Sequence, residues 1–430
     1  MKHQLKISEL PAHLDQEVEV AGFIHLLRNQ GKIGFVTLRN VSGILQCVFL
    51  GEALITELKK LTLESYISVR GKLVTAKQAP NGVEIQVSGF EVLGAAAPEL
   101  PIPVVTIKGG EETEATTRFD YRWIDLRKPE KTKIFKVWTS FERGLRAYWA
   151  KNDYIQIYTP SFMSTPSETG AEVFEVNYFD RKAYLAQSPQ FYKQMAMASG
   201  FDKVFMVGPV FRAELSFTTR HLTEFTGFDF EISNIESHAD VMDSEEGALV
   251  SAFEQLKNDF PELNIEVPSR PFPRITMLEA KEILAKEGVA SGEEHDLSPE
   301  EERAICDYVK KTKNHDFVFI TEYHKSKSAF YHMRLTEGSD RSRRADLLYR
   351  GIEVTTLAQR EHRIEILEKQ AVDKGMDLEA LKDYLNFFRF GCPPHGGAGM
   401  GPGRLIMKIL DLPNVREATY LPRDVKRLNP

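Results

Sequence analysis

Residues 211–231, FRAELSFTTRHLTEFTGFDFE, join two alternating apolar runs through a polar and basic segment. Arg212 and Glu214 stand two positions apart, so on a strand they would share one face. The basic pair Arg220 and His221 precedes the second run, which ends on acidic residues. This pattern predicts two antiparallel strands joined by a basic loop that suits a polyphosphate. A surface hairpin with solvated charges would give the same local pattern, so the rest of the chain has to decide between them.

The composition is that of a globular protein with room for two or three domains. The chain has 430 residues, 42% of them hydrophobic and 27% charged, with no apolar run long enough to span a membrane. The N-terminal residues lack the apolar core of a signal peptide. Cys47, Cys306 and Cys392 are far apart and fit neither a disulfide framework nor a zinc site, which predicts a reducing, cytoplasmic setting. A net charge of -7 argues against a general nucleic-acid binder but leaves room for a local basic patch.

The first part of the chain reads as a small β-barrel. Short alternating or β-rich runs occur at 17–25, 33–39, 44–50, 67–74 and 83–88, with one helical interruption at 53–61. This pattern predicts an OB-type barrel, which we place at residues 1–97. Such barrels bind single-stranded nucleic acid by stacking bases on aromatic rings and pairing phosphates with cations, and the candidates here are Arg28, Phe35 and Gln46. For each of them, ordinary strand packing or a solvated side chain is the simpler alternative.

A change of composition separates this barrel from a second domain. Residues 96–117 are rich in Ala, Pro, Gly, Thr and Glu, so 98–128 are expected to form a linker or hinge, with the second domain at 129–430. A helical period runs from 134 to 149, and a strand is expected at 154–160 before Pro160 closes it. Residues 256–315 are polar and mainly helical in pattern, and we interpret them as an insertion without chemical signature.

A dense polar cluster, QSPQFYKQ, occupies residues 187–194. A helix is expected to begin after Ser188 and Pro189, because proline suits the first turn. The cluster as a whole can bind a small polar ligand. A capped helix start would account for Ser188 and Pro189 but not for the other polar residues.

Charged residues at equal spacing mark a later apolar segment. Asp346, Glu353 and Arg360 are each seven positions apart. On one strand that odd spacing puts Asp346 and Glu353 on opposite faces, unless a turn at 350–351 or a bulge realigns them. Burying Glu353 would be costly without a cation or a metal ion. Near the C-terminus a glycine-dense run precedes Arg404 and an apolar helix, so the backbone there can approach a ligand closely.

Taken together these segments resemble the three sequence motifs of class II aminoacyl-tRNA synthetases, in the right order and over nearly the whole chain. QSPQFYKQ, FRAE, RHLTEF, the segment with Glu353 and Arg360, and the ending PRDVKRLNP are similar to aspartyl-tRNA synthetases of the compact archaeal type. The resemblance implies an α+β fold with an antiparallel catalytic sheet flanked by helices. It also implies an N-terminal anticodon-binding OB domain and a homodimer.

The chemistry implied by the resemblance is aspartate activation by ATP, followed by transfer to tRNA. The family pattern implies ATP contacts from Arg212, Glu214, Arg220, His221, Phe225, Glu353 and Arg404. Arg212, Arg404 and Glu353 would be catalytic, since such a transfer needs positioning and charge neutralisation. Mg²⁺ would be bound by Glu353, Thr356 and Asp346.

The same resemblance implies an aspartate pocket. Lys193 and Arg360 would clamp the side-chain carboxylate, a charge-assisted pairing that rejects neutral asparagine. The other implied aspartate contacts are Glu168, Gln187, Gln190 and Asp229. Asparaginyl enzymes lack the lysine, so Lys193 favours aspartate. The chain departs from the family pattern at Leu357–Ala358, where relatives carry Gly-Gly or Ser-Gly, and at Gly403, where they carry an acid.

The anticodon domain carries His25 and Pro80 where relatives specific for tRNA(Asp) tend to have Trp and Lys. These two residues resemble the enzymes that load aspartate onto both tRNA(Asp) and tRNA(Asn), which depend on an amidotransferase to finish Asn-tRNA. Gln46 and Phe35 would contact the central anticodon base that both tRNAs share. An ordinary strand residue and an ordinary turn residue are the alternative for His25 and Pro80.

Two functions from other classes remain open from the sequence alone. One is a paralogue that activates an amino acid without tRNA, as an asparagine-synthesising relative does, although such proteins usually lack the anticodon domain. The other is an inactive RNA-binding paralogue, which the retained charged positions argue against.

Overall fold

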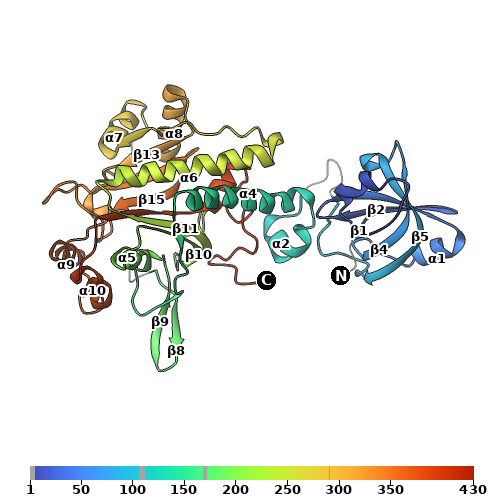
Figure 1. The fold of residues 1–430 in the computed structure, drawn as a ribbon, viewed down its shortest axis with the longest axis horizontal. Helices are drawn as coiled ribbons and strands as arrows, with labels where there is room; N and C mark the ends of the chain where they lie inside the picture. The colour runs from blue at the N-terminus through green and yellow to red at the C-terminus, as the bar shows by residue number, and fades with distance from the viewer. Residues whose placement is uncertain (1–4, 106–111, 168–171, 290) are drawn as a thin grey trace. The chain divides into compact units, whose positions relative to one another are not determined.

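The computed structural model describes residues 5–105, 112–167, 172–289 and 291–430 (Figure 1). Its contacts divide the chain into two compact units, residues 1–133 with 430, and residues 134–429. Glu168, expected in the aspartate pocket, lies outside the described residues. Among the helices that are described, none is long and apolar enough to cross a membrane.

The first unit contains the expected five-stranded barrel. Its strands are β1 (Glu17–Gln30), β2 (Ile33–Asn40), β3 (Gly43–Leu50), β4 (Tyr66–Thr75) and β5 (Val83–Gly94). They close in the order β1-β2-β3-β5-β4, with α1 (Glu52–Leu58) between β3 and β4 in the chain. The alternating apolar residues fill the interior, including Val20, Val36, Leu45 and Ile67, which have no exposed surface. The prediction of an OB-type barrel is therefore confirmed.

The segment expected as a linker contains two short helices, α2 (Ala115–Asp120) and α3 (Arg122–Asp125). Arg122 and Asp125 are fully buried and form an ion pair of 2.7 Å between Nη1 and Oδ2. Arg127 reaches back to Glu64 beside the barrel, at 3.1 Å between Nη1 and Oε2. Ile102 and Val104 are also buried and pack against Ile124 of α3, so the described residues on both sides of the gap at 106–111 belong to the packed first unit.

The second unit is built on an eight-stranded sheet in the order β12-β13-β14-β15-β16-β11-β10-β6. The strands are β6 (Ile155–Gln156), β10 (Lys203–Phe211), β11 (Glu224–Ser233), β12 (Arg274–Thr276), β13 (Phe317–Thr321), β14 (Arg344–Tyr349), β15 (Ile352–Gln359) and β16 (His395–Met400). Neighbouring strands are antiparallel except at the two edges, where β12 and β6 run parallel to their neighbours. The α+β architecture is confirmed, with a mixed rather than purely antiparallel sheet.

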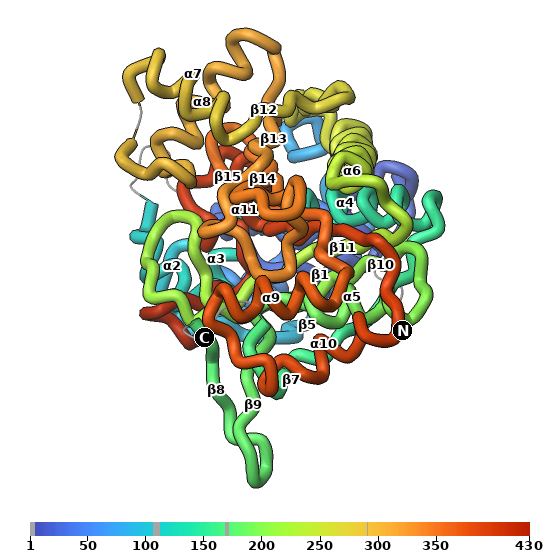
Figure 2. The backbone as a smooth tube through the Cα atoms, turned by 90° about the vertical axis from the view of Figure 1, so that its left-hand side faces the viewer, coloured from blue at the N-terminus to red at the C-terminus, as the bar shows by residue number. Residues whose placement is uncertain are grey.

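Helices cover this sheet on both sides. The long helices α4 (Pro129–Lys151) and α6 (His238–Asp259) lie side by side across one face (Figures 1 and 2). The other helices of the unit are α5 (Gln190–Ala198), α7 (Met277–Lys286), α8 (Pro299–Lys313), α9 (Ile364–Asp373), α10 (Lys382–Arg389) and α11 (Pro402–Ile409). A small sheet of β7 (Phe162–Met163), β9 (Arg181–Leu185) and β8 (Glu175–Tyr178) ends in a hairpin that projects from the unit in both views.

Several boundaries differ from those expected from the sequence. The strand expected at 154–160 is only the two-residue β6, because its pairing is limited to the first residues of β10. The segment 256–315 is not purely helical, since β12 from within it forms one edge of the main sheet. The helix expected to begin after Ser188 and Pro189 is α5, with Pro189 at its N-cap.

The contact between α4 and α6 leaves no room for a side chain at Gly144. A Cβ atom there would lie 2.5 Å from the Cα of Ala252 and 2.7 Å from the carbonyl oxygen of Ser251. The Ser251 hydroxyl also donates to the Gly144 carbonyl oxygen at 2.7 Å. The two backbones therefore touch, and helix α4 must carry glycine at its centre despite the low helix propensity of that residue.

We expect Gly144→Ala to destabilise the second unit by about 1–3 kcal/mol, because overpacking outweighs the better helix propensity of alanine. Chemical denaturation followed by intrinsic fluorescence would measure the change. Ala147→Gly, on the exposed side of the same helix, is the matched exchange and should cost about 0.5–1 kcal/mol from propensity alone. A Gly144→Ala protein more stable than the wild type would contradict this packing.

Candidate functional site

A cavity of about 860 Å³ opens in the second unit. Twelve of the residues singled out in the sequence line it: Gln190, Lys193, Arg212, Glu214, Arg220, His221, Phe225, Asp229, Glu353, Thr356, Arg360 and Arg404. Gln187 and Asp346 are not in the lining. Residues from helices, strands and a loop that are far apart in sequence thus meet in one place, and its volume suits a nucleotide with a small second ligand.

One end of the cavity is built around a buried lysine. Lys193, on α5, is 2% exposed, and its Nζ lies 2.8 Å from Oδ2 of Asp229 and 3.5 Å from Oε2 of Glu231. It also donates to the carbonyl oxygen of Ala398 at 3.0 Å. Asp229 and Glu231 alternate along β11 and so present their carboxylates on the same face.

Arg360, which directly follows β15, also binds the Glu231 carboxylate. Its Nε and Nη2 donate to the two carboxylate oxygens at 2.9 and 3.3 Å, and Nη2 also donates to the carbonyl oxygen of Gly397 at 2.8 Å. Glu231 has no exposed surface. Burial raises the pKa of Glu231, but Arg360 and Lys193 outweigh it and hold that pKa below its usual range. One ionised carboxylate therefore fixes both cations.

Sequence reasoning did not assign Glu231. The available signal was its position two residues after Asp229, on the same strand face. Gly397 gives a second, structural sign of its importance, because a Cβ there would lie 2.1 Å from Oε2 of Glu231. The glycine-rich strand β16 is thus required by a side chain of the neighbouring strand, as well as by any ligand.

The two glutamines of the polar cluster differ in their surroundings. Gln190 lines the cavity, is 4% exposed, and its Nε2 has no hydrogen-bond partner within the part of the chain that is described. Gln187 donates from Nε2 to the carbonyl oxygen of Glu172 at 3.1 Å and lies outside the cavity lining. Gln190 is therefore the one with a donor available to a ligand.

The other end of the cavity carries the basic loop, residues 212–223, between β10 and β11. Arg212 and Glu214 lie in this loop rather than on a strand, because β10 ends at Phe211. They remain close, at 3.7 Å between Nη1 and Oε1, and the Arg212 guanidinium lies 5.6 Å from the ring centroid of Phe225. Antiparallel pairing of β10 and β11 is confirmed, with a longer loop than the sequence predicts.

Arg404 lies in the first turn of α11 and ties this loop to the sheet. Its Nη1 donates to the carbonyl oxygen of Glu353 at 2.9 Å, and its Nε donates to that of Arg220 at 3.4 Å. His221 lies close to Glu214, at 3.7 Å between Nε2 and Oε2. Burial, with Arg404 and Arg220, lowers the pKa of His221 despite Glu214. This end of the cavity, which we call the phosphate end after the role expected from the sequence, thus presents arginines and a neutral imidazole.

A turn and a bulge together align the acidic residues of the β14–β15 hairpin. The turn is at Arg350 and Gly351, both with positive φ, and one extra residue, Val354, stands in β15 between the partners of Leu347 and Leu348. Glu353 consequently comes within 3.3 Å of the Thr356 hydroxyl, which donates to it. The turn and the bulge therefore put Asp346 and Glu353 on the same face of the hairpin, despite their seven-residue spacing.

Glu353 and Asp346 differ as possible metal ligands. Arg404, Arg344 and other arginines outweigh burial and lower the pKa of Glu353, whose side chain is 34% exposed. Asp346 is buried and held by both Nε and Nη2 of Arg344, at 3.1 and 2.6 Å. No group of three or more His, Cys, Asp or Glu arranged for a metal ion occurs among the residues described. The Glu353 carboxylate can bind a hard cation that keeps some of its water ligands, whereas the Asp346 carboxylate is already paired with Arg344.

The departures from the family pattern leave the cavity open. Leu357 has no exposed surface, belongs to the main apolar core and does not line the cavity, because it points to the opposite face from Thr356. Gly403 does line it, and a Cβ there would meet Val415 at 3.2 Å. Neither residue obstructs the site.

The first unit gathers its singled-out residues on one outer face of the barrel. Arg28 pairs with Phe35 across β1 and β2, and Gln46 pairs with Thr37 across β2 and β3. The Gln46 amide donates to Oε2 of Glu84 at 2.7 Å. Pro80 begins a short 3₁₀ turn, residues 80–82, that contacts β3.

His25 is the extra residue of a bulge in β1, between the partners of Leu38 and Thr37. Its Nδ1 lies 2.7 Å from Nη1 of Arg39, which also pairs with buried Glu64. Because an arginine only donates, Nδ1 accepts and the ring proton is on Nε2. Burial and Arg39 lower the pKa of His25, so the ring is neutral. The bulge and Arg39 together fix how this imidazole is presented.

Comparison with known families matches both units. The family of class II tRNA synthetases (D, K and N) matches residues 114–425, and an OB-fold nucleic acid binding domain matches residues 18–93. The aspartate–tRNA(Asp/Asn) ligase of Aeropyrum pernix is 41% identical over 429 residues, covering 96% of this chain and 95% of the relative. The aspartate–tRNA(Asp) ligase of Pyrococcus furiosus is 38% identical over 425 residues, covering 96% of each.

Solved structures show the same architecture. Asparaginyl-tRNA synthetase from Pyrococcus horikoshii, complexed with asparaginyl-adenylate, superposes with a TM-score of 0.92 at 30% identity and covers 100% of both chains. The fold is thus shared by proteins named for different amino acids, and side chains rather than architecture must separate them.

We expect Glu231→Gln to lower the free energy of unfolding by about 3 kcal/mol at neutral pH, because it leaves buried cations uncompensated. When folding lowers the pKa of a carboxyl group, that group stabilises the fold at pH values above its unfolded pKa, which is near 4.5 for glutamate. This stabilisation is lost as the pH falls through the lower pKa of the folded state. The difference between variant and wild type should therefore shrink in acid. Denaturation at a series of pH values would measure it, with the exposed Glu175→Gln as control, and a pH-independent difference would refute the assignment.

Proposed function

The chain belongs to the class II aminoacyl-tRNA synthetases, and we propose that it attaches L-aspartate to both tRNA(Asp) and tRNA(Asn). Aspartylation of tRNA follows from its full-length similarity to aspartate–tRNA ligases. The observation that supports the amino acid independently is the buried pair of cations, Lys193 and Arg360, held on either side of Glu231. The wider tRNA range is supported by His25 and Pro80 on the barrel.

The reaction proceeds in two transfers. An oxygen of the aspartate α-carboxylate attacks the α-phosphorus of ATP, and the bond to pyrophosphate breaks, leaving aspartyl-adenylate. A ribose hydroxyl at the end of the tRNA then attacks the activated carbonyl carbon, and AMP leaves. The first step develops charge on phosphate oxygens, so fixed cations contribute more than a protein base.

We assign the phosphate end of the cavity to ATP. Arg212 would hold the α-phosphate, while Phe225 stacks on the adenine and Glu214 reads its edge. The outer phosphates would be bound by Arg220, His221 and Arg404. A neutral His221 suits this role, because its ring can donate one hydrogen bond without adding to an already cationic end.

Mg²⁺ would be bound by Glu353, with the Thr356 hydroxyl beside it. The ion would neutralise charge on the triphosphate. Asp346 would act indirectly, by holding Arg344.

The other end of the cavity would bind aspartate. Lys193 and Arg360 would pair with its side-chain carboxylate, whereas asparagine would present a neutral amide with N–H donors to these two donor side chains. Asp229 and the free amide of Gln190 would hold the α-amino and α-carboxylate groups, with Gln187 as support. Glu168 is assigned to the α-amino group by family resemblance alone.

For the tRNA, Phe35 would stack on the central anticodon base and Gln46 would contact its edge, with Arg28 on the backbone. His25 and Pro80 would accept either base at the position that distinguishes tRNA(Asp) from tRNA(Asn). Mischarged Asp-tRNA(Asn) then requires an amidotransferase that converts it to Asn-tRNA. The presence of an intact barrel disfavours a tRNA-independent paralogue, and the paired charges of the cavity disfavour an inactive one.

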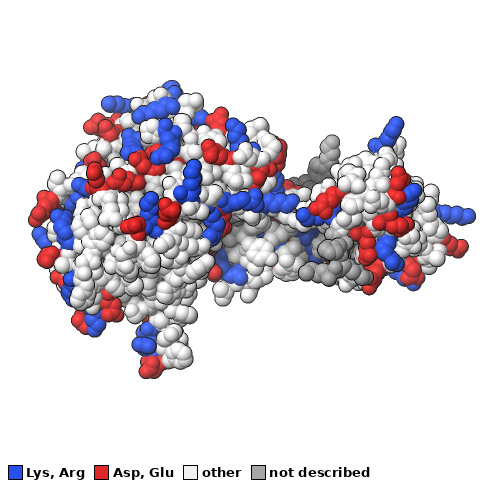
Figure 3. Space-filling view, in the orientation of Figure 1, with Lys and Arg blue, Asp and Glu red and all other residues white. Residues whose placement is uncertain are grey.

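We further propose a cytoplasmic homodimer. The second unit exposes large apolar side chains next to α4 and β6, among them Ile155 and Tyr158, which are 47% and 83% exposed. Figure 3 shows a broad area without charged residues on the face of this unit, whereas charges of both signs mix elsewhere on it. Such a surface suits association with a second copy.

We expect Lys193→Met to reduce aspartate-dependent ATP–pyrophosphate exchange by at least about a hundredfold, because Asp229 loses its cation, Glu231 keeps only Arg360, and the ligand carboxylate loses a contact. Exchange assays with aspartate and asparagine, side by side, measure this. Lys182→Met, at an exposed position of β9, removes the same charge and should leave exchange unchanged. Wild-type exchange with asparagine in place of aspartate would refute the pocket.

We expect the wild type to aminoacylate tRNA(Asn) and tRNA(Asp) transcripts with comparable kcat/KM. The variant carrying His25→Trp and Pro80→Lys should lose charging of tRNA(Asn) by about tenfold or more while keeping that of tRNA(Asp), because discrimination of one base is worth about 1–3 kcal/mol. Pyrophosphate exchange is the control for an intact active site. No charging of tRNA(Asn) by the wild type would refute the dual specificity.

A further inference from the structure

A buried acid of helix α8 contacts the phosphate end of the cavity. Glu302 is 5% exposed and accepts a hydrogen bond of 2.6 Å from Nη1 of Arg220. It belongs to the segment 256–315, in which the sequence shows no chemical signature. The contact links residues 82 positions apart, so only the folded chain reveals it.

The contact engages only part of the Arg220 guanidinium. A guanidinium has five N–H donors in a rigid plane, and only Nη1 is bonded to Glu302. Arg220 itself lines the cavity, and its backbone carbonyl oxygen accepts from Arg404. Fixing one corner of the plane therefore orients the remaining donors while leaving them available to a ligand.

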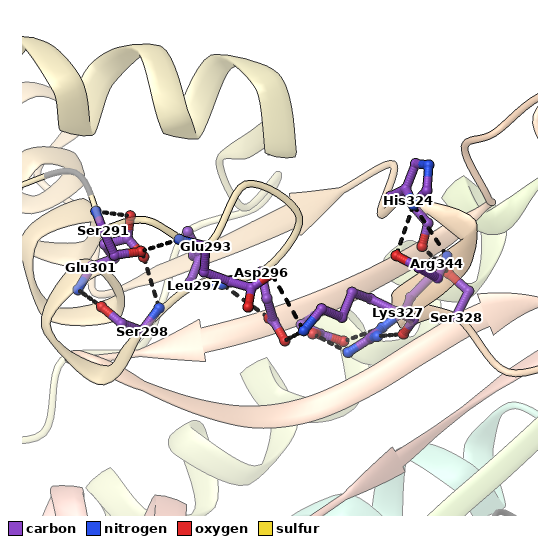
Figure 4. Close-up of polar contacts among 12 residues, drawn as sticks. Ser291, Glu293, Asp296, Leu297, Ser298, Glu301, His324, Lys327, Ser328 and Arg344 are labelled. Carbon is purple, nitrogen blue, oxygen red and sulfur yellow. Dashed lines mark hydrogen bonds and ion pairs between the residues drawn. The ribbon is translucent and has the colours of Figure 1, made fainter.

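The position of Glu302 is itself well defined. The preceding residue, Glu301, accepts hydrogen bonds from the backbone N–H groups of Ser291 and Ser298, at 2.9 and 2.8 Å (Figure 4). It also accepts one from Nζ of Lys281 at 2.8 Å. These contacts anchor the first turn of α8. Glu302 thus extends from a rigid support, which is what orienting another side chain requires.

A second cation at the cavity provides a contrast. Lys327 points from the cavity wall toward the loop before α8, where its Nζ lies 3.4 Å from Glu293 and 3.6 Å from Asp296 (Figure 4). These distances are long, and the Lys327 side chain is 35% exposed, so solvent screens the pairing and it contributes little to stability. The pair of Glu302 with Arg220 is shorter, and the acid is buried, so its geometry is the more constrained.

Electrostatics favours orientation over neutralisation. Burial raises the pKa of Glu302 to about 7, with Arg220 and Arg404 opposing and Glu353 adding to the rise. On the same helix, burial and then Glu302 raise the pKa of the Cys306 thiol. An acid that is partly neutral at physiological pH still accepts a hydrogen bond, and it cancels only part of the Arg220 charge that a phosphate would meet.

We propose that Glu302 is a positioning residue, which holds the Arg220 guanidinium toward the outer phosphates of ATP. The inference rests on the proposed assignment of Arg220 to those phosphates. It gives the helical segment a part in catalysis without any contact between Glu302 and substrate.

The test is the ATP dependence of aspartate-dependent pyrophosphate exchange in the full-length enzyme. Glu302→Leu, which removes the acceptor, should raise the KM for ATP about tenfold, with kcat and the KM for aspartate within about twofold of wild type. Glu302→Gln keeps an acceptor of the same length and should stay within about threefold. Glu302→Asp, which withdraws the acceptor by one methylene, should resemble the leucine variant even if the latter folds poorly. Glu300→Leu, exposed on the same helix, is the matched control and should leave all constants unchanged.

A double-mutant cycle with Arg220→Ala separates the inference from the assignment on which it rests. Arg220→Ala should raise the KM for ATP, and adding Glu302→Leu should raise it no further. If Arg220→Ala has its effect but Glu302→Leu and Glu302→Asp have none, or if the two effects multiply, the inference is overturned and the assignment stands. If Arg220→Ala leaves the KM for ATP unchanged, the assignment is overturned together with the inference.

Discussion

The catalytic unit depends on the burial of one carboxylate, Glu231, between Lys193 and Arg360. A buried charge is tolerated only when its partners are close and well oriented, so this triad fixes α5, β11 and the end of β15 relative to one another. Gly397 is required here too, since the Cβ of any larger residue would clash with this carboxylate and with the carbonyl oxygen of Phe230. The ligand therefore enters a site whose cations are already held in place, and binding does not have to order them.

Architecture alone does not select the amino acid. The chain superposes closely on a protein named for asparagine, although its amino-acid end is built from charges that suit aspartate. Selectivity of this kind lies in what a ligand leaves unpaired. A neutral amide in place of a carboxylate would offer Lys193 and Arg360 a weaker acceptor and would turn N–H donors toward two side chains that can only donate.

Periodic features of the chain were predictable from the sequence, and pairings between distant residues were not. Alternation of apolar residues revealed the barrel, and the helical period revealed α4, because each reflects a local repeat against a core. The roles of Glu231 and Glu302 could not be read in this way, since their partners lie on other elements. Arg212 was expected on a strand if the alternation continued, but β10 ends just before it. The sequence does not show which face of β15 carries Glu353. The bulge at Val354 inserts one residue, and each inserted residue reverses the alternation of faces along a strand.

The bulge at His25 also bears on how the barrel can change in evolution. Ile24 and Leu26 already face consecutive partners on β2, Leu38 and Thr37, so loss of His25 alone would leave the remaining pairs of β1 in register. A one-residue deletion elsewhere in β1 would instead exchange the inner and outer faces of part of the strand, unless the bulge closed in compensation. The bulge is therefore the place where the length of this strand can change while the barrel core is kept.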